Sequence, residues 1–262
     1  MTQSKVIAFT IADDKNLPLA KKMINSFHHF HPDIEVHIVT GDELKGYLAE
    51  DPNFFYKATP IVAEKFIDEY EMVLKLDADQ IILGSLDFVL ESTGWDVGTV
   101  YNLNRVDPKV YGLVSVWDID PTQYFNCGFV AMRSKEFILH WKKLCNSHRF
   151  FAHKYREQDL LNIITHYGNY NVKCFDEYDS MYDYSAWHGL IVKGETMRIE
   201  LRDGKPVLPK GEDNFPVRDV KVKVWHEAGG NNPNKGNYRL YFTEEMVEYI
   251  DNLVKGENET SI

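Results

Sequence analysis

The apolar residues of this chain follow two spacings that alternate along its length. Continuous apolar runs occur in KVIAFT (5–10), EVHIVTG (35–41), MVLKLD (72–77) and DVGTVYN (96–102). Between them, apolar residues recur every three or four positions, as in LPLAKKMINSFHHF (17–30) and TPIVAEKFIDEY (59–70). Unbroken apolar runs are typical of strands buried on both faces, and the second spacing is typical of amphipathic helices. The alternation predicts an α/β fold, with a mostly parallel central sheet flanked by helices.

The alternation continues through the second half of the chain. We expect strands in FNCGFVAMRS (125–134), NVKCF (171–175) and KVKVW (221–225), and helices in KEFILHWKKLCNSH (135–148) and REQDLLNIITHYG (156–168). The Asp203-Gly204 turn inside MRIELRDGKPVLPKG (197–211) predicts an inserted β-hairpin. Thr243 is placed to cap a final helix over 244–254. Because the pattern shows no repeat and no linker, we expect one domain over 1–256 and a polar tail over 257–262.

The composition narrows the classes of protein that fit. The chain has 262 residues, 44% of them hydrophobic, which is enough for a sizeable buried core. Its formal net charge is -11, from 29 basic and 40 acidic residues, and no Lys or Arg run offers a footprint for nucleic acid. No segment has the length of a signal-peptide core or a membrane span, so we expect a cytoplasmic protein. Three cysteines without a Cys-x-x-Cys pair argue against a disulfide framework and a structural zinc site.

Two aspartates one residue apart, Asp77 and Asp79, follow the apolar run MVLKL. Ligands bind open parallel sheets at the carboxyl ends of the strands, and this pair lies at such an end. Beyond the strand both carboxylates can turn toward one cation, and oxygen ligands favour Mg²⁺ or Mn²⁺. The spacing alone is weak evidence, because Asp118-Ile-Asp120 repeats it in a loop with no apolar strand before it. A metal-binding pair and a solvated pair therefore both fit Asp77 and Asp79.

His226 follows the last predicted strand, in the segment VWHEAGG. We expect its imidazole to project from the same sheet edge as the two aspartates, where it would be a third metal ligand and would favour Mn²⁺ over Mg²⁺. The Gly-Gly-Asn-Asn loop that follows lets backbone amides approach an anion closely. A core or surface histidine is the alternative interpretation.

Four segments, taken in order, resemble motifs of the GT-A nucleotide-sugar glycosyltransferases, and most closely glycosyltransferase family 8, which includes glycogenin-like and bacterial galactosyltransferase-like enzymes. LKLDADQIILGSLDFVL resembles the family's Asp-x-Asp segment, and FNCGFVAMRS resembles its Asn-x-Gly strand. EQDLLN resembles its Asp-Gln-x-x-Leu-Asn helix start, and WHEAGG resembles its His-x-x-Gly phosphate loop. The resemblance spans most of the chain. It implies a GT-A (Rossmann-like) fold and a metal-dependent glycosyl transfer that retains the anomeric configuration. The donor would be a nucleotide-diphosphate sugar, which we expect to be a UDP-hexose, and the acceptor would be a hydroxyl group of a glycan or glycoconjugate.

The resemblance also implies roles for matching positions. Metal ligands would be Asp77, Asp79 and His226. Residues that border the donor would be Thr10, Ala12, Lys57, Asp77, Ala78, Asp79, Gly128, Gly229 and Lys235. Residues near the reacting sugar would be Asn126, Glu157, Gln158 and Asp159.

Three positions depart from the family pattern. The family's loop continues to Lys-Pro-Trp, whereas this chain reads GGNNPNKGNY, which weakens the assignment of Lys235 to the diphosphate. Glu157 stands where the family has Asp, so its carboxylate is displaced by one methylene. The basic residue that the family carries upstream of Asp-x-Asp has two candidates, Lys57 and Lys65, each of which also fits a solvated helix charge. For Gln158 and Asp159 the alternative is helix-start chemistry.

Two other functions fit part of the pattern. A sugar-phosphate nucleotidyltransferase uses acidic metal ligands on a related sheet, but FTIADDKN lacks a Gly-rich, Arg- and Lys-bearing signature after the first strand. A carbohydrate-binding protein without turnover would suit the aromatic content, 13% of the chain. We expect the acceptor site to be shaped by the segments that depart from a minimal α/β scaffold, including the hairpin. Candidate residues in these segments are Trp117, Asp118, Tyr182 and Trp187.

Overall fold

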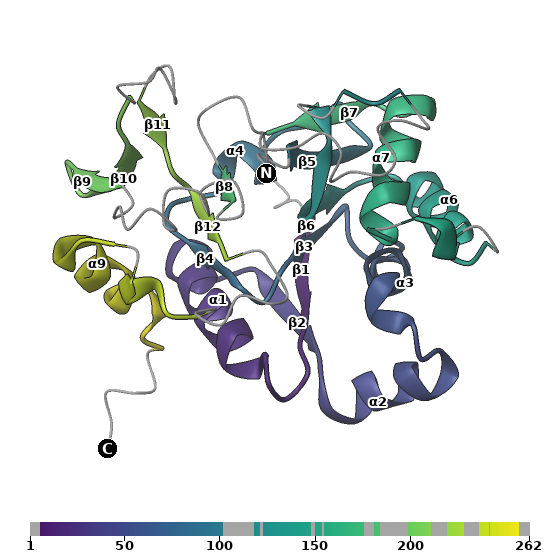
Figure 1. The fold of residues 1–262 in the computed structure, drawn as a ribbon, viewed down its shortest axis with the longest axis horizontal. Helices are drawn as coiled ribbons and strands as arrows, with labels where there is room; N and C mark the ends of the chain where they lie inside the picture. The colour runs from purple at the N-terminus through teal and green to yellow at the C-terminus, as the bar shows by residue number, and fades with distance from the viewer. Residues whose placement is uncertain are drawn as a thin grey trace.

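The computed structural model describes residues 6–101, 118–120, 123–147, 150–153, 155–175, 181–183, 199–210, 219–227, 236–240 and 242–256. Six strands form its central sheet, in the order β2-β1-β3-β6-β5-β7 (Figure 1). Their bounds are β1 Val6–Ile11, β2 Glu35–Val39, β3 Met72–Leu76, β5 Val97–Tyr101, β6 Phe125–Met132 and β7 Val172–Cys174. The sheet is mostly parallel, as the apolar runs predicted.

One strand of the sheet, β6, runs against its neighbours. It pairs antiparallel with both β3 and β5, whereas β1 pairs parallel with β2 and β3, and β5 pairs parallel with β7. The reversal brings the first residues of β6 to the carboxyl edge of the other strands. Asn126 and Gly128 therefore lie beside the end of β3, where the Asp77 amide donates to the Gly128 carbonyl at 2.9 Å.

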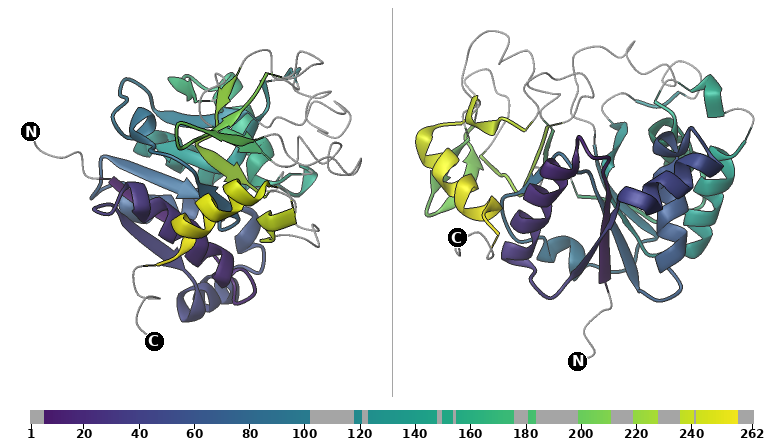
Figure 2. Two further views of the ribbon diagram at one scale, coloured as in Figure 1. Left: turned by 90° about the vertical axis from the view of Figure 1, so that its left-hand side faces the viewer. Right: turned by 90° about the horizontal axis from the view of Figure 1, so that it is seen from below.

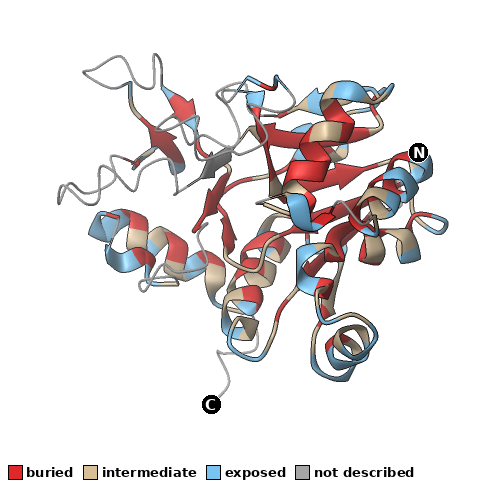
Figure 3. Cartoon of the chain, turned by 45° about the vertical axis from the view of Figure 1, so that its right-hand side comes forward, coloured by how far each residue is buried: buried red, intermediate tan, exposed pale blue. Residues whose placement is uncertain are grey.

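Helices cover both faces of the central sheet, as Figure 2 shows from below. On one face α3 (Ala58–Phe66), α6 (Lys135–Cys145) and α7 (Glu157–Tyr167) bury Val62, Trp141 and Leu161 against Phe9 and Val130. On the other face α1 (Leu17–Phe30) buries Met23 and Phe27 against Leu74 and Phe129. Figure 3 shows the inner strands of the sheet mostly buried, and β1, β3, β5 and β6 have the unbroken apolar sequences that this burial explains.

Two smaller sheets extend the molecule beyond the minimal pattern. The first, β4-β12-β8, joins β4 (Gln80–Ile82), β12 (Val224–His226) and β8 (Met181–Asp183). The second, β11-β10-β9, contains the predicted hairpin, β9 (Glu200–Arg202) and β10 (Lys205–Leu208), together with β11 (Val220–Lys221). The last helix, α9 (Glu244–Val254), packs on the second sheet, and the Thr243 hydroxyl caps it by accepting from the Met246 amide.

The pattern was wrong at one element and silent at several others, among them the short strands β4 and β8. KVKVW is not one strand, because β11 and β12 belong to different sheets and residues 222 and 223 between them belong to neither strand. No expectation covered α2 (Gly41–Glu50), which buries only Leu44 and so has little apolar periodicity to reveal it. The short helix α4 (Asp87–Leu90) and the 3-10 helices η1 (Phe54–Tyr56), η4 (Phe150–Ala152) and η6 (Tyr238–Leu240) complete the described elements. None of the described helices combines the length and the apolar character that a membrane crossing requires.

Candidate functional site

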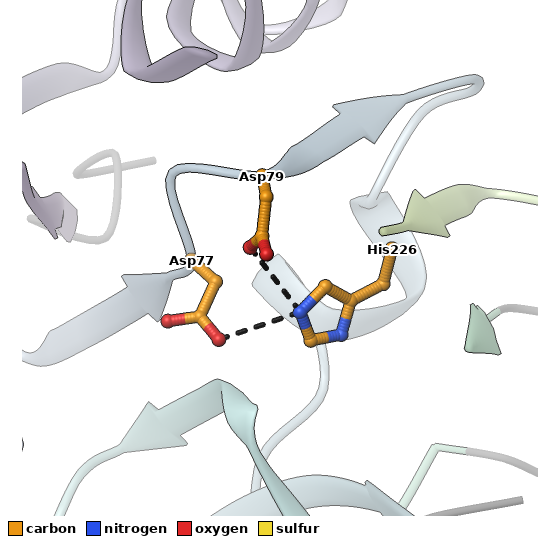
Figure 4. A group of neighbouring side chains, drawn as sticks. All are labelled: Asp77, Asp79 and His226. Carbon is orange, nitrogen blue, oxygen red and sulfur yellow. Dashed lines mark ion pairs between the residues drawn. The ribbon is translucent and has the colours of Figure 1, made fainter. Parts of the chain in front are cut away.

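Asp77, Asp79 and His226 lie together where the central sheet meets the β4-β12-β8 sheet (Figure 4). One ligand atom from each residue lies within 4.8 Å of the other two. The His226 Nε2 atom is 3.4 Å from Asp77 Oδ2 and 3.3 Å from Asp79 Oδ1. The side chain of Asp77 is 37% exposed, whereas the side chains of Asp79 and His226 are only 9% and 8% exposed. The cluster therefore opens to solvent on the side of Asp77.

A turn between two sheets places the aspartates. β3 ends at Leu76, the Gln80 amide donates to the Asp77 carbonyl at 3.2 Å, and β4 then starts in a different sheet. The turn releases both side chains from regular strand alternation. The Glu227 amide donates to the Asp79 carbonyl at 3.0 Å and so ties the turn to the end of β12.

His226 reaches the aspartates by a route that differs from the sequence expectation. It is the last residue of β12, which belongs to the smaller sheet, and does not project from the edge of the central sheet. Antiparallel pairing of β12 with β4 places it opposite Gln80, one residue beyond Asp79. The expected meeting of the three side chains is found, but strand pairing produces it.

Gly128 leaves the space that the cluster occupies. A Cβ atom at this position would lie 2.4 Å from His226 Cε1, 2.7 Å from Asp77 Oδ2 and 2.7 Å from Asn126 Oδ1. Real Cβ atoms do not approach other atoms so closely, so only glycine fits without displacing a member of the cluster. Asn126 Oδ1 accepts from the Gly128 amide at 2.6 Å and fixes this stretch of backbone.

The geometry of the three side chains fits a divalent cation. Neighbouring ligands of an octahedral ion with bonds of about 2.1 Å stand about 3 Å apart, close to the two separations measured from His226. Two carboxylates and one imidazole also form a donor set that Mn²⁺ accepts. The cluster could therefore hold such an ion on Asp77, Asp79 and His226.

Lys75 is a feature of the site that the sequence analysis missed. Its side chain is only 6% exposed, its ammonium group is paired with Asp77 Oδ1, and it donates to the Cys127 carbonyl at 2.7 Å. Burial alone would lower the pKa of Lys75, but Asp77 outweighs it and holds the pKa above its usual value. Burial likewise opposes ionisation of Asp77, and Lys75 with His226 holds the pKa of that carboxyl below its usual range. Asp77 is thus a fixed anion, oriented by one oxygen while the other faces His226.

Glu157, at the start of α7, lies near enough to Lys75 to interact with it electrostatically. Its carboxylate is buried and accepts from the Thr59 amide at 3.1 Å and the Thr59 hydroxyl at 3.0 Å. Burial raises the pKa of Glu157 to about 7, against the opposing effects of Lys75 and Thr59. The contacts with Thr59 join α7 to the first turn of α3 and give this carboxyl a role in packing.

The next two residues of α7 differ in what they contact. Gln158 Oε1 accepts from the Cys127 amide at 3.0 Å, which holds the start of α7 against β6 beside Gly128. Asp159 is fully buried, and its oxygens accept from the Tyr124 hydroxyl at 2.5 Å and the Tyr155 amide at 2.8 Å. These contacts favour the helix-start interpretation for Asp159, while Gln158 stays a candidate beside the sugar.

The donor-side candidates near β1 lie at the expected edge. Thr10 and Ala12 are buried at the end of β1, and within the described part of the chain the Thr10 hydroxyl has no hydrogen-bond partner. Lys57 is paired with Asp51 and donates to Asn146 Oδ1 at 3.2 Å. Lys65 pairs with Glu43 at 3.4 Å and is half exposed, as expected of a solvated helix charge.

Several predicted residues lie outside the described residues. Gly229, Lys235, Trp117 and Trp187 are among them, and only the backbone of Tyr182 is described, within β8. Asp118, from the second Asp-x-Asp, is exposed and has a positive φ of 52°. The metal-ligand clusters found among the described residues do not include it.

Comparison by sequence and comparison by structure give different results. A scan against protein-family models finds no match, and no curated protein matches the chain. The solved structure of the galactosyltransferase LgtC with donor and acceptor sugar analogues superposes with a TM-score of 0.59 at 18% identity, covering 97% of this chain and 98% of that one. The bifunctional glycosyltransferase WbbM gives 0.57 at 14% identity, over 99% of this chain and 51% of that one. The Streptococcus pneumoniae glycosyltransferase GlyE gives 0.54 at 10% identity, over 95% and 63%.

These likenesses define the fold. The chain has the GT-A glycosyltransferase fold, with a mostly parallel central sheet flanked by helices, as the resemblance to family 8 implied. LgtC, a galactosyltransferase, matches along nearly the whole length of both chains.

Proposed function

We propose that this protein is a metal-dependent, retaining glycosyltransferase that moves a sugar from a nucleotide-diphosphate donor, most simply a UDP-hexose, to a hydroxyl group of a glycan or glycoconjugate. The observation that carries the proposal is the cluster of Asp77, Asp79 and His226 at the carboxyl edge of a GT-A sheet. The solved structure of LgtC with donor and acceptor sugar analogues supports it by analogy of fold.

The chemistry divides among the residues of this edge. When bound, a divalent cation such as Mn²⁺ would neutralise the charge that develops on the diphosphate leaving group. Asp77, Asp79 and His226 would hold it, and Lys75 keeps Asp77 ionised and oriented. Gly128 has no side chain, which leaves the cluster open to close approach of a ligand from the side of β6. Asn126 and Gln158, on β6 and α7, would border the donor sugar and stabilise the positive charge that grows on its ring.

Donor hydrolysis with and without Mn²⁺ tests the proposal. We expect Mn²⁺ to stimulate release of UDP from UDP-glucose or UDP-galactose by the wild type, and Asp79→Ala to lose that stimulation. Asp120→Ala removes the second aspartate of the other Asp-x-Asp and is the matched control, expected to behave as wild type. Metal-stimulated turnover that persists in Asp79→Ala would overturn the assignment of the site.

The same assay separates the two rival functions. A nucleotidyltransferase would form UTP from UDP-sugar and pyrophosphate, and a carbohydrate-binding protein would show no turnover and no need of metal for binding. Either result would contradict the proposed transfer.

A further inference from the structure

Two 3-10 helices, η1 and η4, bury one aromatic residue each and expose the next. Phe54 and Phe150 are 1% exposed and anchor the two turns in the core. Phe55, Tyr56 and Phe151, which follow them, are 43%, 55% and 58% exposed. A single exposed ring is ordinary, but exposed rings that lie together form a candidate interaction surface.

Arg156 joins the two turns into one surface. Its guanidinium carbon lies 5.9 Å from the centre of the Tyr56 ring and 5.3 Å from that of Phe151. It donates to the Phe151 carbonyl at 2.9 Å and the His153 carbonyl at 3.1 Å. We call Tyr56, Phe151 and Arg156 the aromatic platform.

Two features of Arg156 set it apart from an ordinary surface arginine. Across the described residues it makes no ion pair with a carboxylate, although the protein is strongly acidic. Its backbone has φ 52° and ψ -119° at the start of α7, a conformation that costs a non-glycine residue about 1–3 kcal/mol and is typical of ligand-binding positions. Arg156 is thus a positively charged residue in a strained backbone conformation, with exposed aromatic rings beside it and no paired carboxylate among the described residues.

The platform lies at the same sheet edge as the candidate metal site. α3 and α7 each precede a parallel strand, β3 and β7, so their first residues lie at the carboxyl edge of the sheet. η1 ends one residue before Lys57, the N-cap of α3, and Arg156 is the N-cap of α7. Glu157 bonded to Thr59 holds these two helix starts together.

Contacts continue from the platform to the metal ligands. Gln158, two residues after Arg156, accepts from the Cys127 amide at 3.0 Å. Lys75 donates to the Cys127 carbonyl at 2.7 Å and pairs with Asp77. The platform therefore flanks the site on the α3 and α7 side, opposite the β4-β12-β8 sheet.

We propose that the aromatic platform binds a pyranose ring of the acceptor saccharide, an inference that rests on the proposed glycosyl transfer. The apolar C–H face of a pyranose packs on Phe and Tyr rings, whose flat faces lose little conformational entropy on binding. The guanidinium group offers N–H donors in a fixed plane to neighbouring sugar hydroxyls.

The size of the platform favours a saccharide over a protein partner. Two half-exposed aromatic side chains present on the order of 200 Å², whereas each side of a stable protein interface buries about 800 Å². One or two sugar rings match the smaller area.

The test measures donor and acceptor functions separately. Methyl glycosides of glucose, galactose and mannose and their 1,4-linked disaccharides serve as probes, with saturation-transfer NMR for binding and UDP release for donor hydrolysis. For Tyr56→Ala/Phe151→Ala we expect acceptor KM, or glycoside Kd, to rise about tenfold, with donor hydrolysis unchanged. Tyr56→Phe keeps the ring and should bind as wild type. Tyr167→Ala, which removes an equally exposed tyrosine at the other end of α7, is the control.

The outcomes distinguish the two proposals. A wild type without metal-stimulated donor hydrolysis contradicts the proposed function itself. A wild type that hydrolyses donor but binds none of the glycosides contradicts the platform. So does a double variant that binds them normally, or one that loses donor hydrolysis together with binding.

Discussion

Gly128 is the residue on which the geometry of the candidate site depends most closely. Gly128→Ala would place a methyl group within 2.7 Å of Asp77 Oδ2 and 2.4 Å of His226 Cε1. We expect this variant to lose Mn²⁺ binding, measured by electron paramagnetic resonance of the free ion, by tenfold or more, ~1.4 kcal/mol. Its fold should persist, because the Asp77 side chain, one of those displaced, is 37% exposed and has room to move.

Gly46→Ala is the matched control for this prediction. Gly46 lies inside α2, and a Cβ there meets nothing within 4 Å. We expect unchanged Mn²⁺ binding and a gain in stability of about 0.5–1 kcal/mol. Wild-type Mn²⁺ affinity in Gly128→Ala would show that the cluster is not the metal site.

Glu157 makes stability depend on pH in one direction. Burial raises its pKa to about 7 in the folded protein, from 4.5 as an ordinary carboxyl. Between these pH values Glu157 binds more protons in the folded state than in the unfolded state, so the stability that this residue contributes is greatest below the lower value and is lost as pH rises through about 7. The fall amounts to up to about 3 kcal/mol.

Glu157→Gln should remove this pH dependence, because the amide stays neutral. Urea unfolding between about pH 5 and pH 8 measures it, with Glu244→Gln, on the exposed first turn of α9, as control. An unchanged slope in Glu157→Gln would contradict the assignment of a raised pKa to this carboxyl.

At the residue scale, the candidate metal ligands could be predicted from the sequence, but the residues that hold them in place could not. Asp77, Asp79 and His226 were identified because each follows an apolar strand and matches a family motif. Lys75 was overlooked, although a lysine inside the fully buried run MVLKL requires a charged partner, and Asp77 two residues on is the nearest. The packing of Asp159 against Tyr124 depends on a tertiary contact that no local pattern reveals.

At the element scale, reversal of β6 and the pairing of β12 with β4 build the site. The apolar pattern predicts that a buried strand exists but not its direction, so the antiparallel β6 could not be foreseen. KVKVW showed only its apolar alternation, and not that its ends join different sheets. The hairpin was predicted correctly because Asp203-Gly204 is a local turn signal, and both residues have positive φ.

The hairpin also changes how the acceptor should be tested. Ile199 and Leu208, at its two ends, are buried in the same hydrophobic cluster as Met246 and Ile250 of α9. Deleting residues 198–209 would therefore unfold part of this cluster instead of acting on transfer alone. Point variants on the aromatic platform avoid the difficulty.

Helix capping gives a prediction at this scale with an internal control. Thr243 caps α9 with its hydroxyl, whereas Thr40, at the same position of α2, makes no such bond. We expect Thr243→Ala to lower the free energy of unfolding by about 1 kcal/mol and Thr40→Ala by only a few tenths. Chemical denaturation measures both, and equal losses would contradict the capping role of Thr243.

At the scale of the whole molecule, the candidate site joins two bodies of structure. Asp77 extends from the central sheet and His226 from the β4-β12-β8 sheet, and both sheets contribute to one buried cluster through Leu74 and Val224. A ligand that binds this junction should stabilise both parts at once. The GT-A sheet could be predicted from periodicity, whereas this junction requires contacts between residues about 150 positions apart.

The most direct test of the central claim is a crystal grown with Mn²⁺ and UDP, with data collected at a wavelength where manganese scatters anomalously. We predict one strong anomalous peak bonded to Asp77, Asp79 and His226, with the diphosphate oxygens of UDP on its open side. A peak elsewhere, or UDP bound with no metal between these three side chains, would contradict the account.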